Sequence, residues 1–254
     1  MQFSKNKKHQ YLLFFILSIY AVFNGGNSNL LIQINFILVS LLFLYSLKDK
    51  NYNLHYLNFL KRNKLSIIFY FIFLLYLVFQ ILPLPIEFLK IFSPEKYKVI
   101  SKLNIDTSYS SISLDVSNSF FQVFNFITLL ILIFLVKMFF YTEKHKNRFY
   151  LFLSCLGFLS SIIAILFYLN GNPDVSIIKN TYYKNASTGF FINRTMFAVF
   201  LLFSLISSLE LLRNFKIKVN KRKDNFFLKI YIRLFVVFIT IGIVTSFSRI
   251  GNFL

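Results

Sequence analysis

The chain has 254 residues, of which 57% are hydrophobic and 15% are charged, and its formal net charge is +19 at pH 7. Too few polar groups remain to cover the surface of a soluble domain of this size, so the composition excludes one and predicts an integral membrane protein. In a soluble protein this excess of positive charge would suggest nucleic acid binding, but in a membrane protein the distribution of Lys and Arg along the chain reports topology. We therefore expect no nucleic acid partner.

Apolar runs of membrane-spanning length follow one another along the whole chain. A run of about 20 apolar residues crosses a bilayer as a helix, and the pattern predicts about seven such helices in an all-α, polytopic transmembrane bundle, with residues 1–254 as a single domain. The first run follows Lys5, Lys7 and Lys8, and because no small-residue cleavage site comes after it, a first helix fits better than a signal peptide. The predicted spans lie near residues 10–27, 29–47, 65–82, 119–137, 149–169, 194–212 and 231–249.

The basic residues gather in alternate connecting segments. Lys and Arg are concentrated before the first span and after the second, fourth and sixth, and these segments share one side of the membrane if every span crosses it. Because cytoplasmic segments carry the excess of Lys and Arg, we expect a cytoplasmic N-terminus. The most basic segment runs from Arg213 to Arg233, and contact with anionic lipid of the inner leaflet explains its charge.

On the opposite side this topology leaves two real loops, residues 83–118 and 170–189. The first loop opens with Pro83 and Pro85, which end the preceding helix. It continues from Ile86 to Phe92 with a spacing that suits a short helix lying on the membrane surface. The second loop is rich in Asn, Gly, Ser and Tyr, and neither loop contains a repeat or a soluble domain.

Arg194 and Arg249 are the arginines that this topology leaves outside the cytoplasm. Arg194 begins the sixth span, and a cation is unfavourable at a helix N-terminus, whereas free backbone N–H groups together with an arginine suit an anion such as phosphate. Asn193 or Thr195 would cap the same end. Arg249 ends the seventh span, where a cation is favoured and Gly251 allows a tight turn, so structure explains it about as well as function does. A cytoplasmic connection between the two spans returns both arginines to one face.

Side-chain amides occur within the spans, whereas ionisable side chains are absent from mid-depth. Gln33, Asn35, Gln80, Gln122 and Asn125 all fall in the outer halves of their predicted helices. Hydrogen bonding between helices explains any one of them, and as a group they suggest a polar cavity open to the outside. The lack of an ionisable residue at mid-depth argues against ion-coupled transport. The sequence also shows no metal-ligand spacing and no nucleotide-binding or hydrolase motif, so we expect neither metal nor cofactor.

Three short motifs resemble motifs of a known protein family. They are Gln80 to Pro85 followed by Ser93-Pro94, Gly189 to Arg194 entering a helix, and Thr245 to Gly251, which contains Ser-Arg-Ile-Gly. In their order, spacing and placement relative to the spans, these motifs resemble those of the O-antigen ligase and O-antigen polymerase group of bacterial polytopic membrane glycosyltransferases, the last being similar to that group's Ser-Arg-x-Gly turn. The similarity covers roughly residues 80 to 254.

The resemblance implies a glycosyltransferase of lipopolysaccharide biosynthesis in the bacterial inner (cytoplasmic) membrane. The donor would be a glycan on an undecaprenyl pyrophosphate carrier, and the acceptor a lipid A-core sugar for a ligase or another carrier-linked glycan for a polymerase, with no metal or nucleotide. By match, Arg194 and Arg249 would bind the pyrophosphate. The supporting polar residues would be Asn193, Gln80, Gln122, Asn125 and Ser248.

Members of this group have about a dozen spans and a catalytic histidine in a large extracytoplasmic loop. The 3 histidines of this chain all fall in segments expected to be cytoplasmic, so the general base has no candidate histidine among these 254 residues. We therefore expect an N-terminal part of such a fold, without the catalytic loop. A polytopic transporter or flippase for a lipid-linked or anionic substrate is the alternative, and a truncated, nonfunctional product is a third. Ionisable residues at mid-membrane further along the reading frame would favour the transporter.

Overall fold

The protein is a multi-pass α-helical membrane protein. The computed structural model describes residues 2–23, 28–48, 50–103, 108–173, 183–217, 225–249 and 251, and it is 80% helical. Within these residues, 5 helices are long and apolar enough to cross a membrane, or 6 if a bent helix pair counts as one span. The all-α, polytopic class is thus confirmed, whereas the count of about seven spans is not, and the orientation stays a prediction.

Helix α1 (Gln2–Val22) accounts for one difference between the predicted and the observed number of spans. The helix begins early enough to include Lys5, Lys7 and Lys8, so it is not among the helices apolar enough to cross. Its apolar part, from Tyr11 to Val22, rises about 18 Å, which is short of a hydrocarbon core of roughly 30 Å. Residues 24–27 of the predicted first span lie outside the described residues.

Contacts group the chain into two compact units. Residues 1–31 and 139–254 form the first, here called the C-terminal unit, and residues 32–138 form the second, here called the central unit. The C-terminal unit contains α1, α8 (Glu143–Leu169), α9 (Arg194–Ile217) and α10 (Asn225–Thr245). The central unit contains α2 (Asn29–Leu47), α3 (Lys50–Arg62), α4 (Lys64–Phe79), β1 (Leu84–Pro85), α5 (Ile86–Phe92), α6 (Pro94–Lys102), β2 (Tyr109–Ser110) and α7 (Val116–Phe139).

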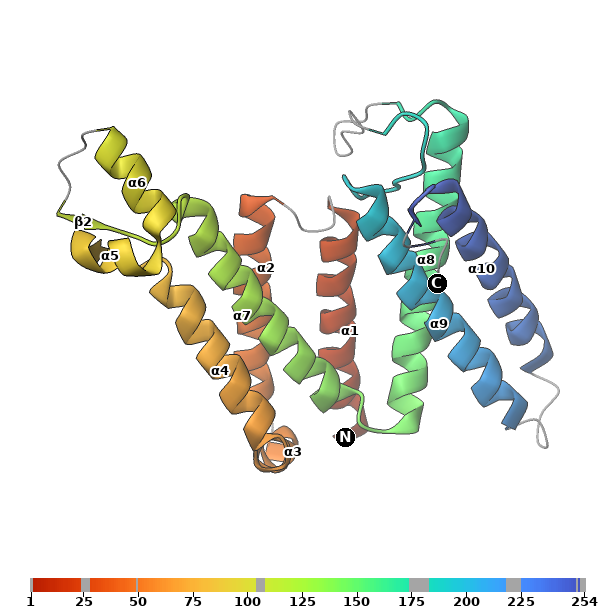
Figure 1. Ribbon diagram of the computed structural model, residues 1–254. Coiled ribbons are helices and arrows are strands. Elements are labelled where there is room, and N and C mark those ends of the chain that lie inside the picture. Colours follow the sequence, from red (N-terminus) through yellow and green to blue (C-terminus); the bar gives the residue numbers. More distant parts are fainter. Residues whose placement is uncertain are drawn as a thin grey trace. The chain divides into compact units, whose positions relative to one another are not determined.

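In the C-terminal unit, α8, α9 and α10 lie side by side (Figure 1). Small residues allow the close approach: a Cβ atom added at Gly157 of α8 would lie 2.3 Å from Ser204 Cβ of α9, and one added at Gly242 of α10 would lie 2.9 Å from Ser161 Cβ of α8. Packing of this kind is typical of helices in a membrane, where small residues bring backbones together. One buried hydrophobic cluster of this unit consists of Ala164, Phe191, Phe197, Leu201, Ile239 and Ile243.

Aromatic contacts join the helices of the central unit. Ring centroids lie 4.8 Å apart between Phe36 of α2 and Phe124 of α7, and 5.1 Å apart between Phe73 of α4 and Phe126 of α7. Helix α3 was not predicted, because its polar sequence is not that of a span. The part of α3 from Tyr56 to Arg62 meets α4 at a bend of 84°.

The segment predicted as the first external loop is well structured. The helix expected from Ile86 to Phe92 is present as α5, and α6 follows it. Strands β1 and β2 pair antiparallel, and Lys96 of α6 donates hydrogen bonds to the carbonyl oxygens of Ser111 and Ser113, both at 2.5 Å. Burial lowers the pKa of the Lys96 ammonium group. Lys96 therefore joins α6 to the segment that leads into α7.

Candidate functional site

Arg194 and Arg249 lie at the same end of the C-terminal unit. Helix α8 ends there at Leu169, α9 begins there at Arg194, and α10 ends there at Thr245 (Figure 1). We call this region the arginine end and define it as residues 169–173, 183–194, 245–249 and 251. Its geometry depends on how the segment before α9 packs onto the ends of α8 and α10.

The segment before α9 is tied to both neighbouring helices by side chains. Asn172, which follows α8 with a positive φ of 54°, donates from Nδ2 to the carbonyl oxygens of Tyr183, Lys184 and Ala186 at 2.8–3.0 Å. Ser187 N donates to the carbonyl oxygen of Thr245 at 2.9 Å, and the two side-chain hydroxyls are also 2.9 Å apart. The last turn of α10 and the entrance to α9 are therefore joined directly.

Gly189 is required at the next bend for two reasons. Its φ is +55°, which L side chains rarely adopt. An added Cβ atom would also lie 2.9 Å from Cε2 of Phe197 and 3.3 Å from Cβ of Ala164. The chain therefore runs tightly over α8 and α9 immediately before Arg194.

Arg194 occupies the first position of α9, as the sequence predicted. The predicted cap is also confirmed, because Asn193 Oδ1 accepts a hydrogen bond from Thr195 N at 2.8 Å. The guanidinium carbon of Arg194 lies 5.2 Å from the ring centroid of Tyr183, a cation–π contact. This half-buried arginine is therefore oriented by an aromatic ring.

The setting predicted for Arg249 is wrong. Helix α10 ends at Thr245 rather than at residue 249, and Phe247 has a left-handed φ of 48°. Arg249 therefore lies beyond α10, exposed, at the start of the next helical segment, and the favourable effect of a helix C-terminus does not apply to it. Ser248 is buried, and its Oγ lies 3.5 Å from Gly251 N, which is the spacing of an N-capping serine.

Gly251 fixes the Ser-Arg-Ile-Gly turn against α9. A Cβ atom added there would lie 2.8 Å from Cβ of Ala198. Ala198 is about one helical turn after Arg194, so the turn that carries Arg249 contacts α9 close to its beginning. Any larger residue at position 251 would move this turn away from α9.

The arginine end is electropositive. Among its described residues, the charged ones are Lys184, Arg194 and Arg249, and neither arginine forms an ion pair with a described residue. Asp174, the acid of the same loop, lies outside the described residues. Two arginines that face no acid among the described residues of this end are chemically suited to an anion that has several oxygen acceptors, such as a phosphate or pyrophosphate.

The predicted supporting residues are divided between the two units. Asn193 and Ser248 lie at the arginine end, where both act as caps. Gln80, Gln122 and Asn125 belong to the central unit, where Gln80 accepts a hydrogen bond at its backbone oxygen from Ser113 N at 3.0 Å. Gln122 is exposed and Asn125 half-buried on α7. Asn193 and Ser248 are therefore the predicted supporting residues that share a unit with the arginines.

Sequence reasoning missed the residues that build the arginine end. Asn172, Tyr183, Ser187 and Thr245 were not predicted to act there. The Asn172-Pro173 pair, three residues after the end of α8, was a usable signal for a structured turn, whereas the pairing of Ser187 with Thr245 has no local signature.

No protein-family model, curated protein or solved structure matches the chain. What the fold and the site define is a class, a multi-pass α-helical membrane protein with an arginine-bearing helix end.

Proposed function

We propose that the arginine end binds the pyrophosphate of an undecaprenyl-pyrophosphate-linked glycan and that the chain belongs to an O-antigen ligase-like glycosyltransferase. The observation that carries the proposal is the convergence of Arg194 and Arg249 at one end of the C-terminal unit without an ion pair to a described residue. The motifs that contain these arginines are the same ones that resemble the ligase and polymerase group.

Transfer of a glycan from a pyrophosphate carrier is favoured by cations beside the leaving group. In the proposed reaction an acceptor hydroxyl of a lipid A-core sugar or a glycan attacks the anomeric carbon, and the bond from that carbon to the pyrophosphate oxygen breaks. Negative charge develops on the departing pyrophosphate, and preorganised guanidinium groups stabilise it. A general base removes the hydroxyl proton, and in the related enzymes that base is a histidine.

The proposal includes a topology. With the basic segments before α4, between α7 and α8 and between α9 and α10 in the cytoplasm, the arginine end faces the periplasm of a bacterial inner membrane, where a carrier-linked glycan is presented. The excess of Lys and Arg in alternate connecting segments supports this orientation.

Binding of lipid pyrophosphate by the purified chain in nanodiscs tests the proposal. We expect undecaprenyl pyrophosphate to bind more tightly than undecaprenyl phosphate, and undecaprenol to bind weakly. Arg194→Gln and Arg249→Gln should each weaken binding of the pyrophosphate by about 10- to 100-fold, the worth of a charged hydrogen bond. Arg→Lys should restore little, because a point charge replaces a planar fork.

Two matched variants serve as controls. Lys144→Gln and Arg213→Gln each remove an exposed charge at the other end of the unit, where α8 begins and α9 ends. Both should bind like the native chain. Unchanged affinity in both arginine variants, or equal binding of undecaprenol, would remove the pyrophosphate site and with it the proposed function.

A further inference from the structure

The central unit contains an apolar cavity of about 410 Å³ where α3 meets α4. Residues of α2, α3, α4 and α7 line it, and most of them are aromatic or aliphatic. Its volume falls in the range of roughly 300 to 1,000 Å³ that is typical of ligand sites. The described acids of this unit, Glu87, Glu95 and Asp115, lie far along the chain from it, in α5, in α6 and before α7.

Helix α3 forms one wall of the cavity. Tyr56, Phe59 and Leu60 line it at the spacing of one helix face, whereas the neighbouring Lys61 and Arg62 are exposed. Because this part of α3 meets the apolar helix α4 at 84°, it lies along the membrane surface if α4 crosses the membrane. The cavity then begins at the depth of the lipid headgroups.

Aromatic contacts hold this wall in place. The ring of Phe134 in α7 lies 5.0 Å from that of Tyr56 and 5.4 Å from that of Phe59, both edge to face. Phe43 of α2 lies 5.6 Å from the same Phe134 ring. Edge-to-face pairs at these distances are favourable, so the wall is a packed feature and not a gap between unrelated helices.

The mouth of the cavity is basic. Lys137, near the end of α7, is one of the lining residues. Lys61, Arg62 and Lys64 are exposed at the bend between α3 and α4. Glu87, Glu95 and Asp115 do not line the cavity, and Asp49, the nearest acid in the sequence, lies outside the described residues. Apolar walls with a positive mouth match an acyl chain that carries an anionic headgroup.

We propose that this cavity binds one acyl chain of an anionic phospholipid, whose phosphate contacts Lys137 and the basic residues of the bend. The lipid would seal an apolar cavity that is only partly enclosed by α4, a helix without a buried residue. The proposal concerns the central unit and does not depend on the pyrophosphate site.

The absence of Trp from the chain makes a direct test available. A single Trp is introduced as Phe71→Trp, at a lining residue, or as Phe69→Trp, at an exposed residue of α4 that does not line the cavity. The purified chain is placed in phosphatidylcholine nanodiscs with a small fraction of brominated phosphatidylglycerol or brominated phosphatidylcholine, and Trp fluorescence quenching is measured. We expect phosphatidylglycerol to be preferred at Phe71→Trp and no preference at Phe69→Trp.

Charge variants in the Phe71→Trp background complete the test. Lys137→Gln should reduce the preference about five-fold, the effect of one basic residue near an anionic headgroup, and Lys137→Arg should retain it. Lys98→Gln, an exposed lysine of α6, should also retain it. Equal quenching by both lipids at Phe71→Trp, the same preference at Phe69→Trp, or a preference that survives Lys137→Gln combined with Lys61→Gln, Arg62→Gln and Lys64→Gln would each overturn the proposal.

Discussion

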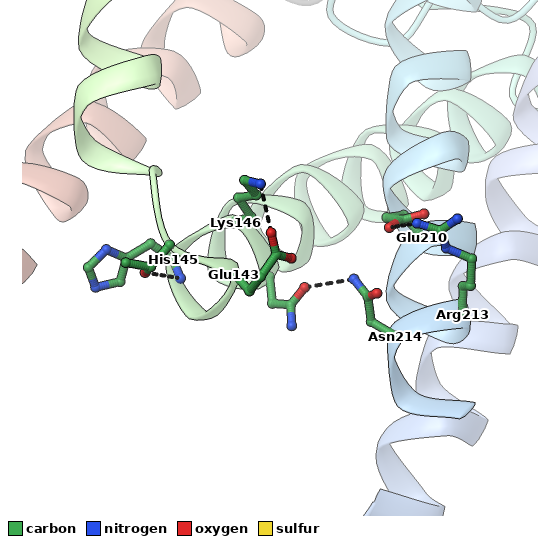
Figure 2. A network of polar contacts seen from close by, with 8 residues as sticks. Glu143, His145, Lys146, Glu210, Arg213 and Asn214 are labelled. Atoms are coloured by element: carbon green, nitrogen blue, oxygen red, sulfur yellow. Dashed lines mark hydrogen bonds and ion pairs between the residues drawn. The ribbon is translucent and has the colours of Figure 1, made fainter. Parts of the chain in front are cut away.

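The two ends of the C-terminal unit differ in whether their charged side chains form ion pairs. Where α8 begins and α9 ends, Glu143 pairs with Lys146 at 2.7 Å and Glu210 with Arg213 at 2.6 Å (Figure 2). We call this region, residues 142–148 and 210–214, the paired end. At the arginine end, Arg194 and Arg249 have no such partner among the described residues.

The difference also concerns how each end is built. Both ion pairs of the paired end join residues three apart on one helix, and Thr142 Oγ1 caps α8 by accepting from His145 N at 3.3 Å (Figure 2). The arginine end depends on hydrogen bonds between residues far apart in sequence, such as Ser187 and Thr245. Ion pairs between residues three apart need only one helix, whereas arginines without an ion pair among the described residues are suited to an external anion.

The largest expected effect comes from overpacking α8 against α9, the two helices that run between both ends of the unit. Gly157→Ala places a Cβ atom 2.3 Å from Ser204 Cβ, so α8 and α9 must move apart. Overpacking of this kind costs about 1–3 kcal/mol, and we expect a lower midpoint of unfolding in mixed detergent, followed by circular dichroism. Thr240→Ala, at an exposed position of α10, should leave the midpoint close to native. An unchanged midpoint for Gly157→Ala would contradict the packing of these helices.

A narrower change should loosen the arginine end alone. Thr245→Val removes the hydroxyl that lies 2.9 Å from Ser187 Oγ and leaves the shape of the side chain nearly unchanged. Ser187 Oγ keeps its hydrogen bond to the carbonyl oxygen of Gly242, so the change removes one hydrogen bond, worth about 0.5–1.5 kcal/mol. We expect faster amide hydrogen exchange at residues 187–191 and unaltered exchange at residues 142–148. Thr240→Val removes a hydroxyl that donates to the backbone oxygen of Val236 in the same helix, so it is the matched control and should change neither segment.

The ring of Tyr183 offers a finer test of how Arg194 is held. Tyr183→Leu removes the ring that lies 5.2 Å from the guanidinium carbon, whereas Tyr183→Phe keeps a ring. Because a cation–π contact is worth about 0.5–1 kcal/mol at an exposed site, Tyr183→Leu should weaken undecaprenyl pyrophosphate binding by roughly two- to five-fold. Tyr183→Phe should bind almost as the native chain does. Equal losses in the two variants would assign the effect to the tyrosine hydroxyl.

The smallest effect is expected at the paired end. Glu210→Gln removes an ion pair in which the arginine side chain is 70% exposed. Pairs of this kind on a helix contribute about 0.3–0.5 kcal/mol, so the unfolding midpoint should fall slightly and the difference from native should vanish at high salt. Ligand binding at the arginine end should not change. A loss of binding here would mean that the two ends are coupled.

The sequence predicted much of the helical framework, because hydropathy and helix caps are local properties. The predicted spans at 29–47 and 119–137 correspond to α2 and α7, and the start of α9 at Arg194 was correct to the residue. Helix α3 escaped detection because it is too polar for a span, and the bend and cavity beside it depend on contacts with α7. The end of α10 was missed because Phe247 takes a left-handed conformation that its residue type does not favour.

The sequence by itself determined that this is a polytopic membrane protein and that Arg194 begins a helix, because composition, apolar run length and the Asn193 cap act over a few residues at a time. Only the tertiary structure decided that α10 ends at Thr245 and that the turn carrying Arg249 contacts α9 through Gly251 and Ala198. These features depend on close contacts and hydrogen bonds between residues that are about 50 positions apart along the chain. Ser187 and Gly242, for example, are 55 positions apart. No local pattern of residues encodes such a pairing, because its free energy is gained only when the helices have already packed.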